Sequence, residues 1–252
     1  MAGHSKWANI KHKKARADAS KGKLFTKLTK EIMVAVKEGG SDIESNFRLK
    51  LAVDKAKQNN MPNENINRAI QKGAGEIGGE SLQEATYEGY GPGKVALLLE
   101  VLTDNRNRTA SDIRNIFSKH GGNLGDAGCV SWMFERKGRL VIEKTDQAPS
   151  EEDLLIIAME AGAQDLKDEA ENYVLFTEPE DFEEVKEKIQ EEGIDLASAE
   201  VTMVPNMNVY LEDEEDVERL FKLLEALEDH DDVQNLYANF EVPEKMIKAF
   251  QG

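Results

Sequence analysis

The stretch GHSKWANIKHKKARADASKGKLFTKLTK (residues 3–30) sets the basic N-terminal part of the chain apart from everything that follows it. It holds nine lysines and arginines and one acidic residue, Asp18, whereas the whole 252-residue chain has a net charge of −17. Residues 1–75 carry 16 basic and 7 acidic side chains, and the remainder carries 16 basic and 42 acidic ones. Exposed charges more than about 10 Å apart are screened at 0.1 M salt, so the distant acids do not cancel this basic end. The asymmetry predicts that the basic end binds a polyanion.

Towards the C-terminal end of this stretch and beyond it, the spacing of apolar residues becomes that of amphipathic helices. Apolar residues recur at helical spacing from Lys23 to Gly39, and a second amphipathic segment follows Ser41–Glu44, which reads as a capping box. A third short helix is expected from Asn63 to Gly73. We therefore predict a basic three-helix domain over residues 1–75. Its first 21 residues have few apolar side chains and are expected to form a flexible arm.

Beyond the glycine-rich residues 73–80, strands alternate with helices. Residues 94–102 (KVALLLEVL) predict a buried strand, Thr109–Asp112 predicts a helix start, and alternation at Val130, Trp132 and Phe134 predicts another strand. The order of elements predicts an α+β, multidomain fold in which two ferredoxin-like α/β domains are nested. The outer domain comprises residues 80–135 plus 206–242, the inserted domain comprises 137–205, and 243–252 form a C-terminal helix or tail.

Several motifs suggest chemistry that the spacing does not support. Residues 88–94 (EGYGPGK) lack the first glycine and the final Ser or Thr of a phosphate loop, so we interpret them as a turn. Cys129 lies in an apolar segment without an orienting group near His120, which favours a packing role over a nucleophile. The acidic runs 212–216 and 228–232 fit a helix N-terminus and a solvated turn better than a metal site. No catalytic residue, metal or cofactor is expected.

The candidate nucleic-acid-binding residues are mainly basic. Trp7 is interleaved with cations, which is typical of segments that stack on bases, although Trp7 could instead pack on the first helix. Arg106 and Arg108 precede a predicted helix, where they could contact phosphate or pair with Asp104 and Asp112. The full candidate set is Lys6, Trp7, Lys11, His12, Lys13, Lys14, Arg16, Lys21, Lys23, Lys27, Arg106 and Arg108.

Composition narrows the cellular setting. No apolar run approaches the roughly 18 residues that span a membrane, and the N-terminus lacks the apolar segment of a secretory signal. The single cysteine excludes an intramolecular disulfide and fits a reducing compartment. We expect a cytoplasmic monomer without a membrane partner.

Six segments resemble one family. They are GHSKWANIKHKK (3–14), KAKQNNMP (55–62), YEGYGPGK (87–94), TDNRNRT (103–109), GGNLGDAGCVSWMF (121–134) and DDVQNLYANF (231–240). The chain is similar from end to end to the YebC/PmpR family, which includes the mitochondrial translational activator of cytochrome c oxidase subunit I. Lys94 departs from the family pattern, which has glycine there.

The resemblance implies one helical and two α/β domains and no enzymatic activity. It implies a DNA-binding transcriptional regulator, and the family's members in translation imply an alternative, a ribosome-bound factor whose arm reaches rRNA. The expectation from sequence is thus a non-enzymatic regulator of gene expression whose partner is nucleic acid, either DNA or rRNA.

Overall fold

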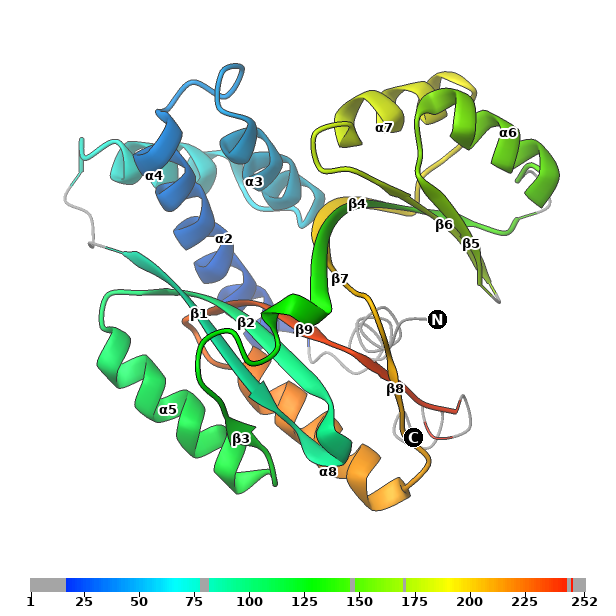
Figure 1. Ribbon diagram of the computed structural model, residues 1–252. Helices are drawn as coiled ribbons and strands as arrows, with labels where there is room; N and C mark the ends of the chain where they lie inside the picture. Colours follow the sequence, from blue (N-terminus) through cyan, green and yellow to red (C-terminus); the bar gives the residue numbers. More distant parts are fainter. Residues whose placement is uncertain (1–16, 78–81, 146–147, 170, 244–245, 247–252) are drawn as a thin grey trace. The chain divides into compact units, whose positions relative to one another are not determined.

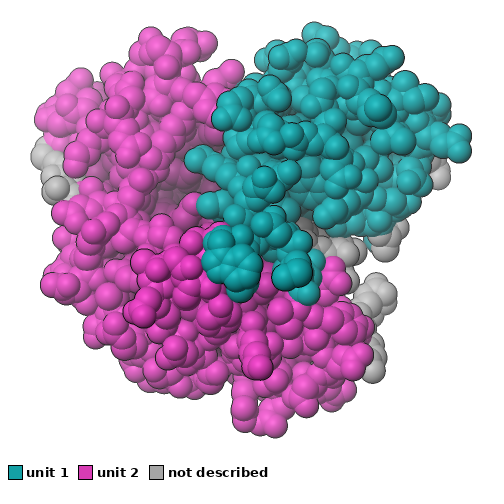
Figure 2. Space-filling model, in the orientation of Figure 1, with its two compact units in different colours: residues 1–2, 132–208 teal, residues 3–131, 209–252 magenta. Residues whose placement is uncertain are grey.

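The computed structural model describes residues 17–77, 82–145, 148–169, 171–243 and 246. They fall into two compact units, coloured separately in Figure 2. Residues 132–208 form one, here called the inserted unit, and the described residues on either side of it form the other, the main unit. The chain thus leaves the main unit and returns to it. Among the described helices, none has the length and apolar character required to span a membrane.

Three helices begin the main unit (Figure 1): α2 (Ala17–Gly39), α3 (Phe47–Gln58) and α4 (Asn63–Gly73). Because α2 starts at Ala17, residues 17–21, which were expected in the arm, are helical. The predicted capping box at Ser41–Glu44 is wrong, since α3 is capped by Asn46. The Asn46 carboxamide oxygen accepts from the Leu49 N–H at 3.0 Å, and its NH₂ group donates to the carbonyls of Ala35 and Gly40. One buried side chain thus serves the start of α3 and the end of α2.

The main unit continues with a four-stranded antiparallel sheet in the order β3-β1-β2-β9. Its strands are β1 (Gln83–Tyr90), β2 (Ala96–Thr103), β3 (Asn123–Leu124) and β9 (Val233–Ala238). Helix α5 (Arg106–Lys119) joins β2 to β3 with β1 between them, which is a split βαβ unit, and α8 (Glu214–Glu228) precedes β9. A short parallel pair is formed by β8 (Val209–Tyr210) and β10 (Phe240–Glu241). Strand β1 was not predicted, because only the end of its sequence is buried.

The core of the main unit confirms the buried strand predicted over residues 94–102. Six of the eight residues of β2 lie among the buried hydrophobic residues, and those on one face pack with Phe117 of α5 and Phe221 of α8. The predicted helix start at Thr109–Asp112 is wrong, since α5 begins three residues earlier behind the N-cap Asn105. The Asn105 side chain accepts from the Arg108 N–H at 3.1 Å.

The inserted unit carries a second antiparallel sheet, in the order β5-β6-β4-β7. Its elements are β4 (Phe134–Glu143), α6 (Glu151–Ala161), β5 (Asp165–Asp168), β6 (Asn172–Thr177), α7 (Phe182–Glu191) and β7 (Ser198–Pro205). Each helix joins two parallel strands that flank a third, so the unit is ferredoxin-like. The strand expected at Val130–Phe134 is wrong, because Ser131–Met133 form a 3-10 turn with Trp132 64% exposed. The predicted α+β, multidomain fold class is confirmed.

The turn between β1 and β2 strains one residue. Pro92–Lys94 form a 3-10 turn, in which Gly93 has φ of 66° and Lys94 has φ of 62°. A residue with a Cβ pays roughly 1–2 kcal/mol in this left-handed region, and glycine does not. The glycine that the resemblance implies at position 94 therefore has a conformational reason.

We expect Lys94→Gly to raise the free energy of unfolding by about 1 kcal/mol, because it removes this strain. Urea unfolding monitored by circular dichroism would measure the change. Lys50→Gly inside α3 is the control, and it should lower stability by about 1 kcal/mol. A loss of stability in Lys94→Gly comparable to that of the control would contradict the strain.

Candidate nucleic-acid interface

The candidate residues predicted from sequence divide into two groups. The first lies outside the described residues and comprises Lys6, Trp7, Lys11, His12, Lys13, Lys14 and Arg16. The second is described and comprises Lys21, Lys23, Lys27, Arg106 and Arg108. Lys21 is exposed on α2, whereas the other four contact neighbouring parts of the main unit.

Lys23 and Lys27 of α2 contact the C-terminal end of α8. The Lys27 ammonium donates to the Glu228 carbonyl at 2.6 Å, and the Lys23 ammonium donates to the Asp229 carbonyl at 3.3 Å. The last carbonyls of a helix lack intrahelical donors and carry the negative end of the helix dipole. Helix α8 has no basic residue of its own in its last turn. Lysines from α2 supply that positive charge instead.

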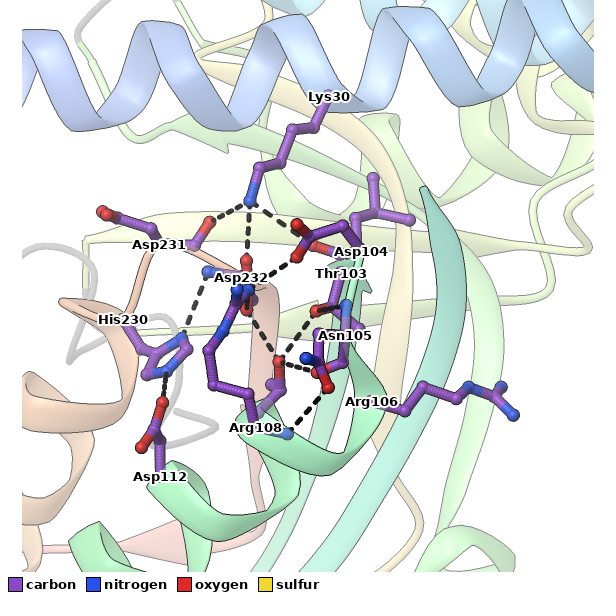
Figure 3. Close-up of polar contacts among 12 residues, drawn as sticks. Lys30, Thr103, Asp104, Asn105, Arg106, Arg108, Asp112, His230, Asp231 and Asp232 are labelled. Carbon is purple, nitrogen blue, oxygen red and sulfur yellow. Dashed lines mark hydrogen bonds and ion pairs between the residues drawn. The ribbon is translucent and has the colours of Figure 1, made fainter. Parts of the chain in front are cut away.

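Lys30, one turn further along α2, contacts the segment that follows α8 (Figure 3). Its ammonium lies 2.8 Å from Oδ1 of Asp232 and also donates to the Asp231 carbonyl at 3.1 Å. Asp232 is buried, with 7% of its side chain exposed, and Lys30 is largely covered, with 14% exposed. The helical part and the α/β part of the main unit are therefore joined by an ion pair sheltered from water.

The other oxygen of Asp232 accepts from the start of α5. The Thr109 hydroxyl donates to Oδ2 at 2.7 Å and the Arg108 guanidinium donates to it at 3.1 Å. The hydroxyl of Thr103 lies 2.8 Å from that of Thr109, and the Asn105 N–H donates to Thr103 at 2.9 Å. Because Thr109 gives its proton to Asp232, Thr103 is the donor in the hydroxyl pair. A continuous chain of hydrogen bonds thus runs from the helix start to the buried carboxylate.

This environment keeps Asp232 ionised. Burial acts to raise the pKa of the Asp232 carboxyl, but hydrogen bonds from Lys30, Thr109 and Arg108 outweigh burial and hold that pKa well below its usual range. The interpretation of residues 228–232 as a solvated turn is therefore wrong for Asp232. Composition gives no sign of the difference, because five polar residues in succession look the same whether one of them is buried or not.

The two arginines have different surroundings. Arg108 also pairs with Asp104 at 2.7 Å, as the pairing alternative predicted, while Asp112 faces Nε2 of His230 at 3.6 Å rather than an arginine. The Arg106 side chain points away from the Asp232 cluster in Figure 3, and its guanidinium donates to the Glu84 carbonyl. Arg108 is thus part of the cluster, and Arg106 is not.

A second buried carboxylate, Glu88 of β1, holds the loop before the inserted unit. It accepts from the backbone N–H groups of Gly128, Val130 and Ser131 at 2.7, 2.7 and 2.8 Å. Burial opposes ionisation, yet these hydrogen bonds hold the pKa of Glu88 below its usual value. In the same loop, burial and the charge of Glu88 raise the pKa of the Cys129 thiol, so it lacks the thiolate character that a nucleophile requires.

Both carboxylates connect segments that are distant in sequence. The Asp232 cluster joins residues 103–109 to residues 231–240, and Glu88 joins residues 87–94 to residues 121–134. These are four of the six segments that carry the family resemblance. Polar residues of these segments therefore hold parts of the main unit together. Among the residues that the structure describes, no group of three or more His, Cys, Asp or Glu side chains could hold a metal ion.

Family models and individual relatives match most of the chain. Residues 5–76 match the model of the TACO1/YebC protein N-terminal domain, and residues 82–240 match that of the TACO1/YebC second and third domain. A probable transcriptional regulatory protein of Natranaerobius thermophilus is 56% identical over 98% of this chain and 99% of its own. Another, from Halothermothrix orenii, is 53% identical over 98% of each chain.

A solved structure is also similar. The crystal structure of a conserved hypothetical protein from Aquifex aeolicus has a TM-score of 0.81 and 51% sequence identity, and the match covers 93% of this chain and 96% of that one. Identity at this level over nearly the full length, together with two family models that cover most of the chain, leaves one conclusion. This chain belongs to the TACO1/YebC family.

Proposed function

We propose that the protein regulates gene expression by binding nucleic acid and catalyses no reaction. The observation that carries the proposal is the separation of charge, with 16 basic against 7 acidic side chains in residues 1–75 of a strongly acidic chain. Relatives more than half identical to it are named probable transcriptional regulatory proteins, which supports a regulatory role. We further propose that it works as a cytoplasmic monomer.

The contacts in the main unit suggest where the binding charge is. Lys23, Lys27 and Arg108 are engaged with backbone carbonyls or carboxylates, so using them for phosphate would break those contacts. Residues 3–16, in contrast, carry five lysines and arginines and no acidic residue. We therefore assign the main phosphate-binding role to this segment and to the exposed Lys21.

Two targets fit a segment of this composition, and Trp7 distinguishes them. DNA is the first, in keeping with the relatives' names. Ribosomal RNA is the second, and it is favoured by the aromatic ring among the cations, because rRNA offers unpaired bases for stacking and duplex DNA does not without distortion.

Trp7→Ala tests the choice. If the target is rRNA, we expect ribosome co-sedimentation to weaken roughly tenfold or more while duplex DNA binding barely changes, since stacking on a base contributes about 1–3 kcal/mol. Trp132→Ala is the matched control, because the only other tryptophan lies in the inserted unit. Tight, sequence-selective DNA binding by a protein that never sediments with ribosomes would contradict rRNA as the target and favour DNA.

A further inference from the structure

A pocket lies between α2 and α4. It is lined by Thr29 of α2 and by Asn65, Arg68, Ala69 and Lys72 of α4, and its volume is about 180 Å³. One water needs roughly 10–15 Å³ of such volume, so the pocket has room for several waters or for one solvated phosphate group. None of its lining residues belongs to the set predicted from sequence.

Close packing of the two helices forms the pocket. Ala69 is fully buried, and α4 ends against α2 at Gly73, where a Cβ would lie only 2.7 Å from the Met33 carbonyl oxygen. Only glycine permits this approach. The side chains of Arg68 and Lys72, four residues apart on α4, are therefore held over the groove on the same helical face.

The pocket is lined with hydrogen-bond donors and with no carboxylate. Its lining includes a guanidinium, an ammonium and a carboxamide, which are groups that can donate to phosphate oxygens, whereas the Thr29 hydroxyl donates to the Phe25 carbonyl at 2.7 Å. The acid closest in sequence, Glu64, pairs with Arg68 at 3.5 Å with both side chains largely exposed. An exposed pair of this kind contributes about 0–1 kcal/mol and exchanges readily for a phosphate.

The cations of this pocket, both on α4, differ from the lysines of α2 in their contacts. Lys27 and Lys30 are committed to the end of α8 and to Asp232, whereas Lys72 has no ion pair within the described part of the chain.

We propose that this pocket binds a backbone phosphate of the nucleic acid, with Arg68 and Lys72 as the charged contacts and Asn65 as a neutral donor. It is a second contact, separate from the basic N-terminal segment, and it rests on the proposed function. A strand held at both places would be fixed in register by the folded helices and not only by residues 3–16.

The test is a fluorescence-anisotropy titration of the full chain with a short labelled duplex DNA and a short labelled single-stranded RNA across a range of salt. For Arg68→Gln with Lys72→Gln we expect affinity to fall more than about tenfold at 0.1 M salt. The log–log salt slope should become shallower by about 1.8 on duplex DNA or about 1.4 on single-stranded RNA, the value for two phosphate contacts.

The matched control is Arg219→Gln with Lys222→Gln. It removes the same two charges from exposed positions on α8, where each is paired with a glutamate one turn earlier. The control should retain the wild-type slope. Asn65→Asp is a second variant, which places a carboxylate in the pocket without removing a cation, and it should weaken binding by repulsion.

Three results would overturn the proposal, and they differ in what else they affect. If the pocket variant and Asn65→Asp keep the wild-type slope while Lys11, Lys13 and Lys14 reversed to Glu lose binding, the pocket is wrong and the proposed function stands. If the pocket variant and the α8 control lose the same affinity, the loss comes from the change in net charge and not from the pocket. If the wild-type protein binds neither nucleic acid, the proposed function fails together with the pocket.

Discussion

Asp232→Asn is expected to lower the free energy of unfolding of the main unit by about 3 kcal/mol, because removing one partner of a buried ion pair leaves the other without compensation. Lys30, which is 14% exposed, would lose its carboxylate, and the hydrogen bonds from Thr109 and Arg108 would be weakened. Urea unfolding followed by circular dichroism would measure the loss.

Asp104→Asn is the matched control. Asp104 pairs with the same Arg108 but is half exposed, so its replacement should change stability by less than about 1 kcal/mol. Equal effects of the two substitutions would show that burial of the Asp232 cluster adds nothing to stability.

The same substitution has a signature in pH. The folded-state pKa of Asp232 is depressed, so its contribution is complete above the unfolded pKa and is lost as pH falls through the acid range below about pH 5. We expect the wild-type protein to lose stability on acidification more steeply than Asp232→Asn does. Parallel curves for the two proteins would contradict the depressed pKa.

Reversing Lys11, Lys13 and Lys14 to Glu should have the largest effect on binding. Loss of three phosphate contacts flattens the log–log salt slope by about 2.7 on duplex DNA and about 2.1 on a single strand, which is roughly 500-fold in duplex affinity at 0.1 M salt. About five contacts from the N-terminal cations alone should give slopes of about −4.5 on duplex DNA and about −3.5 on a single strand, and the two proposed pocket contacts would add to them. Anisotropy titrations at several salt concentrations would measure them.

Changes in the N-terminal segment should weaken binding without lowering the stability of the fold. Residues 2–16 are polar, so their deletion is expected to leave thermal unfolding of the remainder nearly unchanged while it weakens binding. A fall in melting temperature of many degrees would place Trp7 and Ile10 in a core. An unchanged salt slope in the triple variant would show that the phosphate-binding cations lie elsewhere on the protein.

The fold was largely predictable because its signals are local. A continuous apolar run identified β2, period-3.6 patterns identified the amphipathic helices, and the order of elements predicted the nesting in the fold class. The errors came where tertiary contacts override local pattern. Asn46 replaced the expected capping box because its amide also completes α2, and Val130 was not in a strand because Glu88 holds the surrounding backbone.

The candidate site was less predictable, for a physical reason. A lysine that binds phosphate and a lysine that completes a helix end look alike in sequence, and only the position of α8 separates Lys27 from Lys21. Likewise, Arg68 and Lys72 become neighbours of Thr29 only when α4 packs on α2. The segments that resemble the family did mark the polar clusters, but not which partner each residue would contact.

The contacts of the α2 lysines with the end of α8 also determine where this protein can be divided into stable fragments. The two family models meet between residues 76 and 82, which suggests a natural place to separate an N-terminal fragment from the rest. A fragment that starts at residue 82 would retain every strand of its sheet, yet α8 would end on bare carbonyls and Asp232 would be a buried anion without Lys30. The boundary between these sequence domains is therefore not a boundary in the packing, because the helical part supplies the partners of charged and polar groups in the α/β part.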